Sequence, residues 1–371
     1  MYRWLNFVAA TAAFTLQMMA ACNSADIRVV SKEVPGFPSP VDCNIRLKGQ
    51  ISVGDAKKLK LALSQFKEFA NAAPMLCLES DGGDFAEAIL IVEAILQPHN
   101  HIGANTVVEA HKNCLSACAF IFMAGMECVG TADRCNPARS LDVTARLGFH
   151  APRAEDIPGA QFDDRALGTA YKTAMLQMAR LSQSFSHRAE SGQYQGTAWV
   201  RLTLFSELLQ RDANNFYNID SVAKVGFLDI GLVGVSSALS ISKPMLYYAC
   251  TNKTNWQNGE IGEYNVVDKY RSYDLLNKSI FGRTVMTEGN FQSRVTELSQ
   301  DVTYKLNLWA KCKATQPLDR RTKQPVEENA SLSVDGQRGW PLEGWSLFPG
   351  NTSLSQLSDP SFLKRAQAAV E

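Results

Sequence analysis

Met75-Leu76-Cys77-Leu78-Glu79-Ser80-Asp81-Gly82-Gly83-Asp84 is the stretch that decides the fold of this chain. Its first four residues are apolar, which fits a strand buried in a parallel sheet. Gly82 and Gly83 lack Cβ atoms, so the backbone can turn sharply there and present its N–H groups. The helix expected from Phe85 to Gln97 adds a partial positive charge at its start. The stretch therefore predicts either an ordinary β–α turn or a loop that holds an anion.

Short apolar segments and helical segments alternate on both sides of this stretch. Ile45 to Ile51 alternates apolar and polar residues, as a half-exposed strand does. Strand–helix alternation of this kind predicts an α/β fold in which helices cover a parallel sheet. The other expected elements are helices at 56–73, 116–125, 163–190, 199–210 and 221–225, and strands at 104–110 and 146–149.

Two further motifs add chemistry to the glycine loop. Asn113-Cys114-Leu115-Ser116-Ala117-Cys118 opens an apolar run, and Leu147-Gly148-Phe149-His150-Ala151-Pro152 follows a short strand. Acyl transfer by a serine needs backbone N–H groups for an oxyanion, a hydroxyl nucleophile and a base. Serine is also a favoured helix N-cap, and a lone histidine is more often structural. The order of the three motifs favours the catalytic interpretation.

The order and surroundings of these motifs resemble the ClpP/crotonase superfamily, and within it the ClpP-like serine peptidases. The family's Ser-Pro-Gly-Gly loop reads Ser80-Asp81-Gly82-Gly83 here, with aspartate in place of proline. The family's serine region reads Leu115-Ser116-Ala117-Cys118-Ala119, and its His-Gln-Pro reads His150-Ala151-Pro152. Ser221 to Asp229 resembles the helix that ends in Gly-Leu-Val-Asp. The chain looks most like the exported, cysteine-containing ClpP-like proteins of the bacterial periplasm, over residues 43–235.

This resemblance implies a fold and a site. The fold is a ClpP/crotonase-like parallel sheet, a superhelix of ββα units covered by helices. The function is that of a serine hydrolase, a peptidase, with Ser116 as nucleophile and His150 as general base. The loop of Gly82 and Gly83, with the N–H of Ala117, forms the oxyanion hole. The substrate is a peptide or protein, no cofactor is needed, and assembly into a homo-oligomer stays open.

The acid that would orient the base is the least well defined member of this site. Counting back from Gly226, as in the family, leads to Asn214 rather than to an aspartate. Asp212 is the preferred candidate, with Asp220 and Asn214 as alternatives. Without an acid the tautomer of His150 is less well fixed. A dyad, or an inactive descendant of the family, therefore remains open.

Two other functions compete with the hydrolase. One is an envelope binding or scaffold protein that keeps the ClpP-like fold but has lost turnover. The other is a Ser/Lys peptidase with Lys112 or Lys172 as base, although the histidine motif argues against it. Coenzyme A chemistry is disfavoured, because acyl-CoA is scarce outside the cytoplasm.

The first twenty-one residues read as an export signal. Arg3 supplies the positive charge, and Phe7 to Ala21 is largely apolar but too short to span a bilayer comfortably. Met19-Ala20-Ala21-Cys22 resembles a bacterial lipobox, so lipidation of Cys22 would attach the protein to a membrane. Plain cleavage elsewhere before Asp26 is the alternative. The expected location is the periplasm or a membrane-anchored lipoprotein, with residues 22–42 as a linker.

Cysteine usage agrees with export. Nine cysteines are present, and removing Cys22 from the pairing pool leaves an even number. The spacing suggests the pairs Cys128–Cys135, within an apparent insertion at 127–142, and Cys250–Cys312. Cys114 and Cys118 would share a face of a helix, so they can bond only if the helix start is distorted. No metal site is expected, because the ligand spacings that zinc usually needs are absent.

Charge and composition bear on nucleic-acid binding and on the number of domains. Lysine plus arginine and aspartate plus glutamate number 37 each, so the formal net charge is zero and a nucleic-acid surface is not expected. Residues 240–371 differ in composition from the rest of the chain. They read as a small C-terminal domain, α+β or irregular, of unknown function. Within this part, 247–250 and 304–311 are expected to form paired strands.

Overall fold

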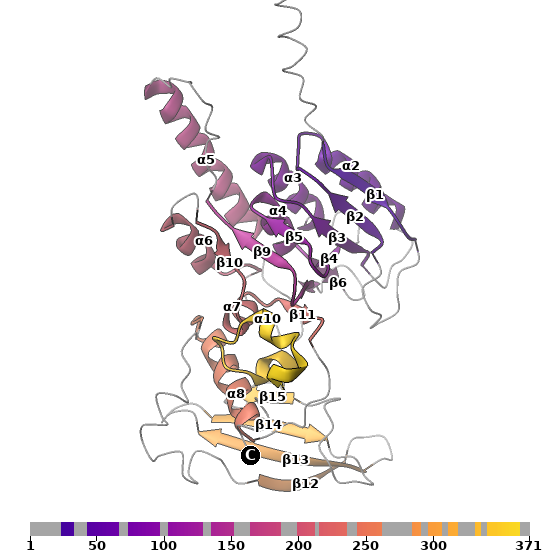
Figure 1. Ribbon diagram of the computed structural model, residues 1–371, viewed down its shortest axis with the longest axis vertical. Coiled ribbons are helices and arrows are strands. Elements are labelled where there is room, and N and C mark those ends of the chain that lie inside the picture. Colours follow the sequence, from indigo (N-terminus) through magenta and orange to yellow (C-terminus); the bar gives the residue numbers. More distant parts are fainter. Residues whose placement is uncertain are drawn as a thin grey trace, which may run out of the picture.

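The computed structural model shows a mixed α/β protein whose central sheet is mostly parallel (Figure 1). No helix of the described residues has both the length and the apolar character needed to cross a membrane. The structure describes residues 24–32, 43–66, 73–96, 103–128, 135–151, 164–186, 199–211, 215–235, 243–261, 284–290, 296–305, 311–317, 331–334 and 340–363.

The central sheet has six strands in the order β1-β2-β3-β4-β8-β11. The first strand pairs antiparallel with the second, and every later pair is parallel. Parallel strands need covering helices on their faces, which explains their apolar sequences. The strands are β1 (Asp26–Val29), β2 (Ile45–Lys48), β3 (Met75–Glu79), β4 (Asn105–Val108), β8 (Arg139–Asp142) and β11 (Gly231–Val233).

A smaller sheet carries two of the three sequence motifs. Its order is β10-β9-β5, with β5 (Asn113–Leu115) parallel to β9 (Arg146–Phe149) and β10 (Tyr217–Asn218) antiparallel to β9. A bridge between Ser80 and Cys114 joins the end of β3 to β5. The glycine loop, the serine and the histidine are thereby brought to one edge of the fold.

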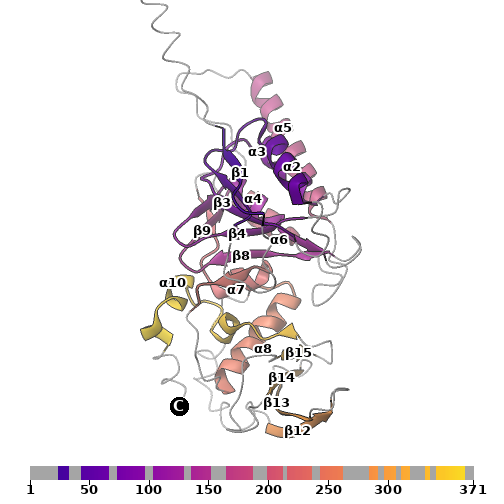
Figure 2. The same cartoon turned by 90° about the vertical axis from the view of Figure 1, so that its right-hand side faces the viewer.

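Four helices pack around these sheets, and α3 contacts the other three (Figure 2). Helix α4 is buried along its whole length, which explains its purely apolar sequence. The helices are α2 (Asp55–Leu63, followed by the 3-10 turn η1, Ser64–Phe66), α3 (Phe85–Leu96), α4 (Ala117–Met123) and α5 (Asp164–Ser184).

The chain after residue 200 closes the core and then builds a second sheet. This sheet is five-stranded and antiparallel, and α8 packs against it (Figure 1). Gly226 lets α8 approach α7, because a Cβ there would lie 2.1 Å from the Trp256 ring. The elements are α6 (Leu202–Leu209), α7 (Val222–Phe227), α8 (Lys243–Gln257), β12 (Thr284–Asn290), β13 (Thr296–Lys305), β14 (Lys311–Pro317), β15 (Ser331–Val334), β16 (Trp340–Pro341), η4 (Gly344–Leu347) and α10 (Leu354–Leu357).

Three sequence expectations need correction. Residues 22–42 are not all linker, because β1 pairs with β2 inside the sheet. The apparent insertion at 127–142 forms the hairpin β6 (Met126–Cys128) and β7 (Cys135–Pro137) but also the central strand β8. Residues 247–250 lie in α8 rather than in a strand, because a short apolar run does not by itself distinguish strand from helix.

A few charged residues lie where α8 meets the core. Burial raises the pKa of the Asp229 carboxyl, although Lys253, Arg139 and Arg201 favour its charged form. Burial also lowers the pKa of the Lys253 ammonium, against the attraction of Asp229. Burial thus disfavours the charged forms of both groups where the C-terminal part meets the core.

Arg139 on β8 is a buried cation that holds three segments together. Its side chain donates hydrogen bonds to the carbonyls of Met123 (2.7 Å), Trp199 (3.0 Å), Leu228 (2.8 Å) and Asp229 (3.2 Å). Met123 is the last residue of α4, and Leu228 follows α7, so the cation satisfies carbonyls at the C-termini of two helices. The end of α4 opposite Ser116 is thereby fixed.

Replacing this cation should strongly destabilise the protein. In Arg139→Met the buried carbonyls lose their donors, and we expect the free energy of unfolding to fall by about 3–5 kcal/mol. Urea unfolding followed by circular dichroism measures the change. Arg146→Met, at an exposed position of β9, is the matched control and should stay within about 0.5 kcal/mol of wild type. Equal losses in the two variants would contradict this role.

Asp55 anchors the start of α2 next to the glycine loop. Its buried carboxylate accepts hydrogen bonds from Ser24 Oγ (2.6 Å), Lys58 Nζ (2.9 Å) and the N–H groups of Ser52 (2.9 Å) and Ala25 (3.2 Å). Burial opposes its ionisation, but these hydrogen bonds outweigh burial and lower its pKa. The neighbouring Ile51 bridges to Gly83, so this anchor supports the loop.

The lowered pKa sets the direction of a pH effect. Because the folded-state pKa lies below the unfolded value, the extra stability is complete above the unfolded pKa of about 4. It is lost as the pH falls through the folded-state pKa. We expect Asp55→Asn to be less stable than wild type by about 1–3 kcal/mol at pH 7, and the difference to shrink below about pH 4. Asp26→Asn, at an exposed ion pair, is the control for urea titrations at both pH values.

Candidate functional site

Ser116 stands between a strand and a helix in an unusual backbone conformation. Strand β5 ends at Leu115, helix α4 begins at Ala117, and Ser116 has φ 56° and ψ −124°. Its N–H donates to the carbonyl of Gly148 on β9 at 2.8 Å. A serine on such a strand-to-helix turn presents its hydroxyl rather than burying it, as nucleophile elbows do. The half-buried Ser116 side chain fits that description.

The conformation of Ser116 is not that of an ordinary turn. Among the described residues, His111 and Asp229 are the other non-glycine residues with positive φ. Asp229 follows the end of α7, where a left-handed residue is common, and His111 lies in a turn. Ser116 instead precedes a helix. Sparsely populated backbone of this kind costs about 1–3 kcal/mol and concentrates at functional sites.

The glycine loop lies directly against Ser116. Gly82 and Gly83 have φ of 115° and 139°, which side chains rarely adopt. A Cβ on Gly82 would lie 2.7 Å from the Cβ and 3.1 Å from the Oγ of Ser116. A Cβ on Gly83 would lie 2.2 Å from the carbonyl oxygen of Ile51. Glycine is needed at both positions for the loop to sit between Ile51 and the serine.

The N–H groups near Ser116 differ in their availability. The N–H of Gly82 donates to Ser80 Oγ at 3.1 Å, and that of Asp84 donates to the carbonyl of Ile51 at 2.8 Å. Within the part of the chain that the structure describes, the N–H groups of Gly83 and Ala117 have no acceptor. Gly83 and Ala117 are therefore the two expected donors that remain available to a ligand.

His150 follows β9 on the same edge. It lies two residues beyond Gly148, which accepts the N–H of Ser116, and its ring meets the edge of Phe216 with centroids 4.9 Å apart. Its Nδ1 lies 2.6 Å from the carbonyl oxygen of Ala151. A carbonyl only accepts, so in the neutral imidazole this contact places the proton on Nδ1 and leaves the lone pair of Nε2 for a general base. In the described chain, Ser116 Oγ makes no hydrogen bond to His150.

The structure separates the three candidates for the orienting acid. Asp212 and Asn214 lie outside the described residues. Asp220 forms an ion pair with Lys224 at 2.8 Å. The antiparallel pairing of β10 with β9 carries Asp220 away from His150, since Ile219 already bonds to Leu147. No described carboxylate contacts His150.

The two candidate lysine bases are not brought to Ser116. Lys172 is exposed on α5. Lys112 Nζ lies 3.2 Å from the Glu79 carboxylate, which also pairs with Lys48 at 3.2 Å. Burial opposes ionisation of Glu79, but hydrogen bonds from Lys112 and Lys48 outweigh it and lower its pKa. These side chains line a cavity of about 500 Å³ that reaches Gly82 and Gly83.

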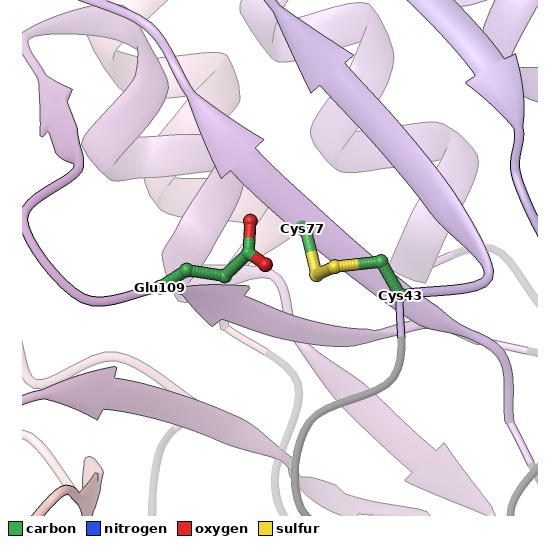
Figure 3. A group of neighbouring side chains, drawn as sticks. All are labelled: Cys43, Cys77 and Glu109. Carbon is green, nitrogen blue, oxygen red and sulfur yellow. A yellow bond between two sulfur atoms is a disulfide. The ribbon is translucent and has the colours of Figure 1, made fainter.

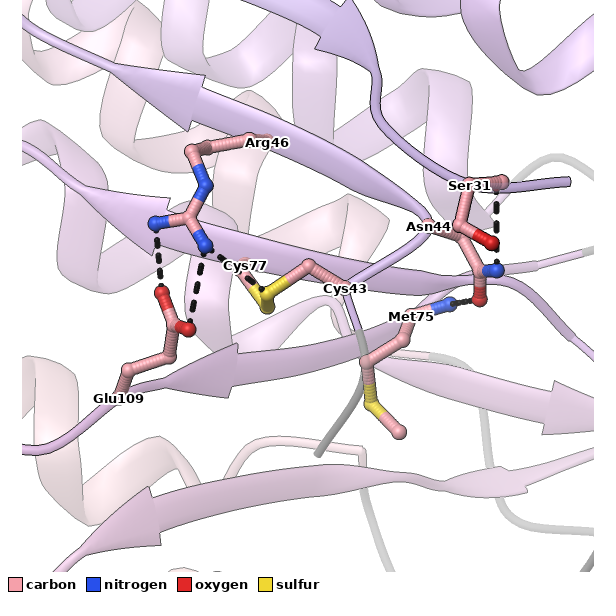
Figure 4. Close-up of a disulfide and its surroundings, with 7 residues drawn as sticks. All are labelled: Ser31, Cys43, Asn44, Arg46, Met75, Cys77 and Glu109. Carbon is pink, nitrogen blue, oxygen red and sulfur yellow. Dashed lines mark hydrogen bonds and ion pairs between the residues drawn. A yellow bond between two sulfur atoms is a disulfide. The ribbon is translucent and has the colours of Figure 1, made fainter. Parts of the chain in front are cut away.

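One disulfide on the central sheet was not expected from the sequence. Cys43 and Cys77 form a disulfide beside Glu109 (Figure 3). The Arg46 guanidinium binds both oxygens of Glu109 at 2.7 and 3.1 Å and donates to Cys43 Sγ at 3.4 Å (Figure 4). The sulfurs are bonded to each other and the carboxylate to a cation. In this state the cluster joins the start of β2 to β3 rather than offering metal ligands.

The disulfides follow the sequence expectation in part. Cys128 and Cys135 are bonded as expected. Cys114 and Cys118 are also bonded, and the distorted helix start that their pairing requires is the backbone of Ser116. Cys250 is disulfide-bonded, but the side chain of its expected partner Cys312 lies outside the described set. The three disulfides whose partners are both described are typical of an oxidising compartment.

Comparison with known proteins gives remote likenesses among solved structures alone. No protein-family model matches the chain, and no curated protein matches it. Among solved structures, a point mutant of ClpP1 from Listeria monocytogenes is similar, with 14% identity and a TM-score of 0.34. The match covers 51% of this chain and 89% of the Listeria chain. The site therefore stands on the chain's own geometry.

The close approach of Gly82 to Ser116 can be tested without any activity assay. Gly54 is a matched control, because its φ is 98° but nothing lies within 4 Å of a Cβ built there. Gly54→Ala should lower the free energy of unfolding by about 1–2 kcal/mol, from backbone strain alone. Gly82→Ala should lose a further 1–3 kcal/mol or so, because Ser116 must move. Equal losses in urea unfolding would show that the loop does not press on the serine.

Proposed function

We propose that this chain is a ClpP-like serine hydrolase of the bacterial envelope, a peptidase that acts on peptides or proteins. The proposal includes a ClpP/crotonase-like superhelix of ββα units over residues 43–235. The observation that carries it is the backbone of Ser116, which has a positive φ between β5 and α4, with the glycine loop against its hydroxyl. Strain of this kind persists only where the surroundings enforce it.

The proposed chemistry is acyl transfer. Ser116 Oγ attacks the carbonyl carbon of a peptide bond while its proton passes to Nε2 of His150. The N–H groups of Gly83 and Ala117 hold the negative oxygen of the tetrahedral intermediate. The C–N bond then breaks, and His150 returns the proton to the leaving amine. Water, activated by the same imidazole, releases the acyl group from Ser116.

A backbone carbonyl takes the orienting role in this proposal. The carbonyl of Ala151 accepts the Nδ1 proton of His150 and so selects the tautomer that a general base requires. Unlike a carboxylate, it brings no charge to stabilise the imidazolium. We therefore describe the machinery as a Ser–His dyad, which Asp212 or Asn214 would extend to a triad.

The envelope location rests on two features. The leader has the form of an export signal, with Cys22 as the proposed lipidation site, and the described cysteines are paired. Export supplies the oxidising surroundings in which such disulfides persist.

One observation is compatible with a second candidate. Ser116 Oγ and His150 are not hydrogen-bonded in the described chain. An inactive binding or scaffold protein with the same fold would also tolerate this gap between Ser116 and His150, which no hydrogen bond closes. Catalytic hydrogen bonds are often long without substrate, so the gap alone does not favour the scaffold over the hydrolase.

Labelling with a serine-directed fluorophosphonate separates the two candidates. The wild type should be labelled, and Ser116→Ala should abolish labelling with a nearly unchanged melting temperature. His150→Ala should slow labelling by about 1,000-fold or more, because dyad members act as a unit. Ser206→Ala and His111→Ala, at exposed positions, are the matched controls and should label normally. Labelling that survives in Ser116→Ala refutes the nucleophile, and an unlabelled wild type favours the scaffold.

A further inference from the structure

The Cys114–Cys118 disulfide spans the serine. Cys114 lies two residues before Ser116 on β5, and Cys118 lies two residues after it on α4. The Cα atoms of the two cysteines are 5.1 Å apart, and both side chains are fully buried. The bond therefore joins the end of strand β5 to the first turn of helix α4 across Ser116.

This bond is incompatible with an α4 helix that extends back through Ser116 to residue 114. If α4 continued backward in ordinary helical geometry, residues 114 and 118 would stand four apart on one helix. Their Cβ atoms would then be about 5–6 Å apart, whereas a disulfide needs about 3.5–4.5 Å. The closed ring excludes that alternative and leaves the conformation in which Ser116 faces the glycine loop.

The remaining contacts of Ser116 are few. They are the bond from its N–H to Gly148, the bond from the Ala119 N–H to its carbonyl (3.0 Å), and the packing of Gly82. Without the disulfide, α4 is free to extend backward past Ser116 toward residue 114, which gives the serine ordinary helical backbone. Two hydrogen bonds and one packing contact oppose that gain, which is of the same order as the strain.

We propose that the Cys114–Cys118 disulfide is the positioning element of Ser116, and that the site assembles only in the oxidised chain. The bond forms by exchange of the two thiols with a disulfide oxidant such as oxidised glutathione, which leaves as two thiols. A chain kept reduced would fold with its serine turned away. The reactivity part of this inference rests on the proposed function, and the conformational part does not.

The other disulfides provide matched controls. Cys128–Cys135 closes the β6–β7 hairpin, and Cys43–Cys77 joins β2 to β3. Each removes two sulfurs and one cross-link when replaced by alanine, as at 114 and 118. Neither spans Ser116.

The test compares Cys114→Ala/Cys118→Ala with Cys128→Ala/Cys135→Ala in the full oxidised chain. Two measurements are made: the second-order rate of fluorophosphonate labelling, and hydrogen exchange at the amides of Ser116 and Ala119. In the first variant we expect labelling to slow by about 100-fold and exchange at both amides to quicken. The control variant should match wild type in both measurements. Cys114→Val/Cys118→Ala, which refills the buried space, replaces the first variant should it fail to fold.

The outcomes separate this inference from the proposed function. Unchanged labelling and exchange in the first variant overturn the inference while leaving the hydrolase intact. An unlabelled wild type overturns the hydrolase, and the exchange data then decide the inference alone. Equal effects in both variants show general destabilisation and also overturn the inference.

Discussion

A buried cation holds this fold together. Arg139 stands on a central strand and donates to carbonyls from the end of α4, from the segment before α6 and from the turn after α7. A guanidinium in that position has lost its hydration and is stable only because each carbonyl faces it. The carbonyls in turn need it, because helix ends buried without donors are unfavourable. Cation and helix ends therefore require each other, and the position of α4 depends on both.

The opposite end of α4 carries the proposed nucleophile. There Ser116 is held from three sides, by β9 through Gly148, by the glycine loop through Gly82, and by the disulfide that spans it. Each constraint is short-range and steric or covalent, so small displacements are resisted. The same edge offers two N–H groups that have no acceptor among the described residues, and an imidazole whose Nδ1 faces a carbonyl. The arrangement is that of a preorganised site, built by elements far apart in the sequence.

The sequence predicted this arrangement where local pattern decides it. The glycine loop and the histidine were recognisable because each follows a short apolar strand, and the serine because it begins an apolar helical run. The Cys43–Cys77 bond was not, because the two cysteines become neighbours only when Ile45 and Leu76 pair in the parallel register. Arg139 was hidden for the same reason, in a segment taken for an insertion. The helix at 247–250 was missed because aromatic runs fit either secondary structure. Long-range pairing, unlike local pattern, leaves no mark in a single sequence.

The reach of Arg139 also has a consequence for the order of assembly. Its partners lie 16, 60, 89 and 90 residues away along the chain. A chain made from its N-terminus produces the serine long before the turn after α7 exists. Until that turn arrives, the cation has the Met123 and Trp199 carbonyls but lacks those of Leu228 and Asp229, so the contact at the far end of α4 is incomplete. Ser116 is therefore synthesised early but held in its final position only late, so an unfinished or truncated chain lacks part of the support for the proposed site.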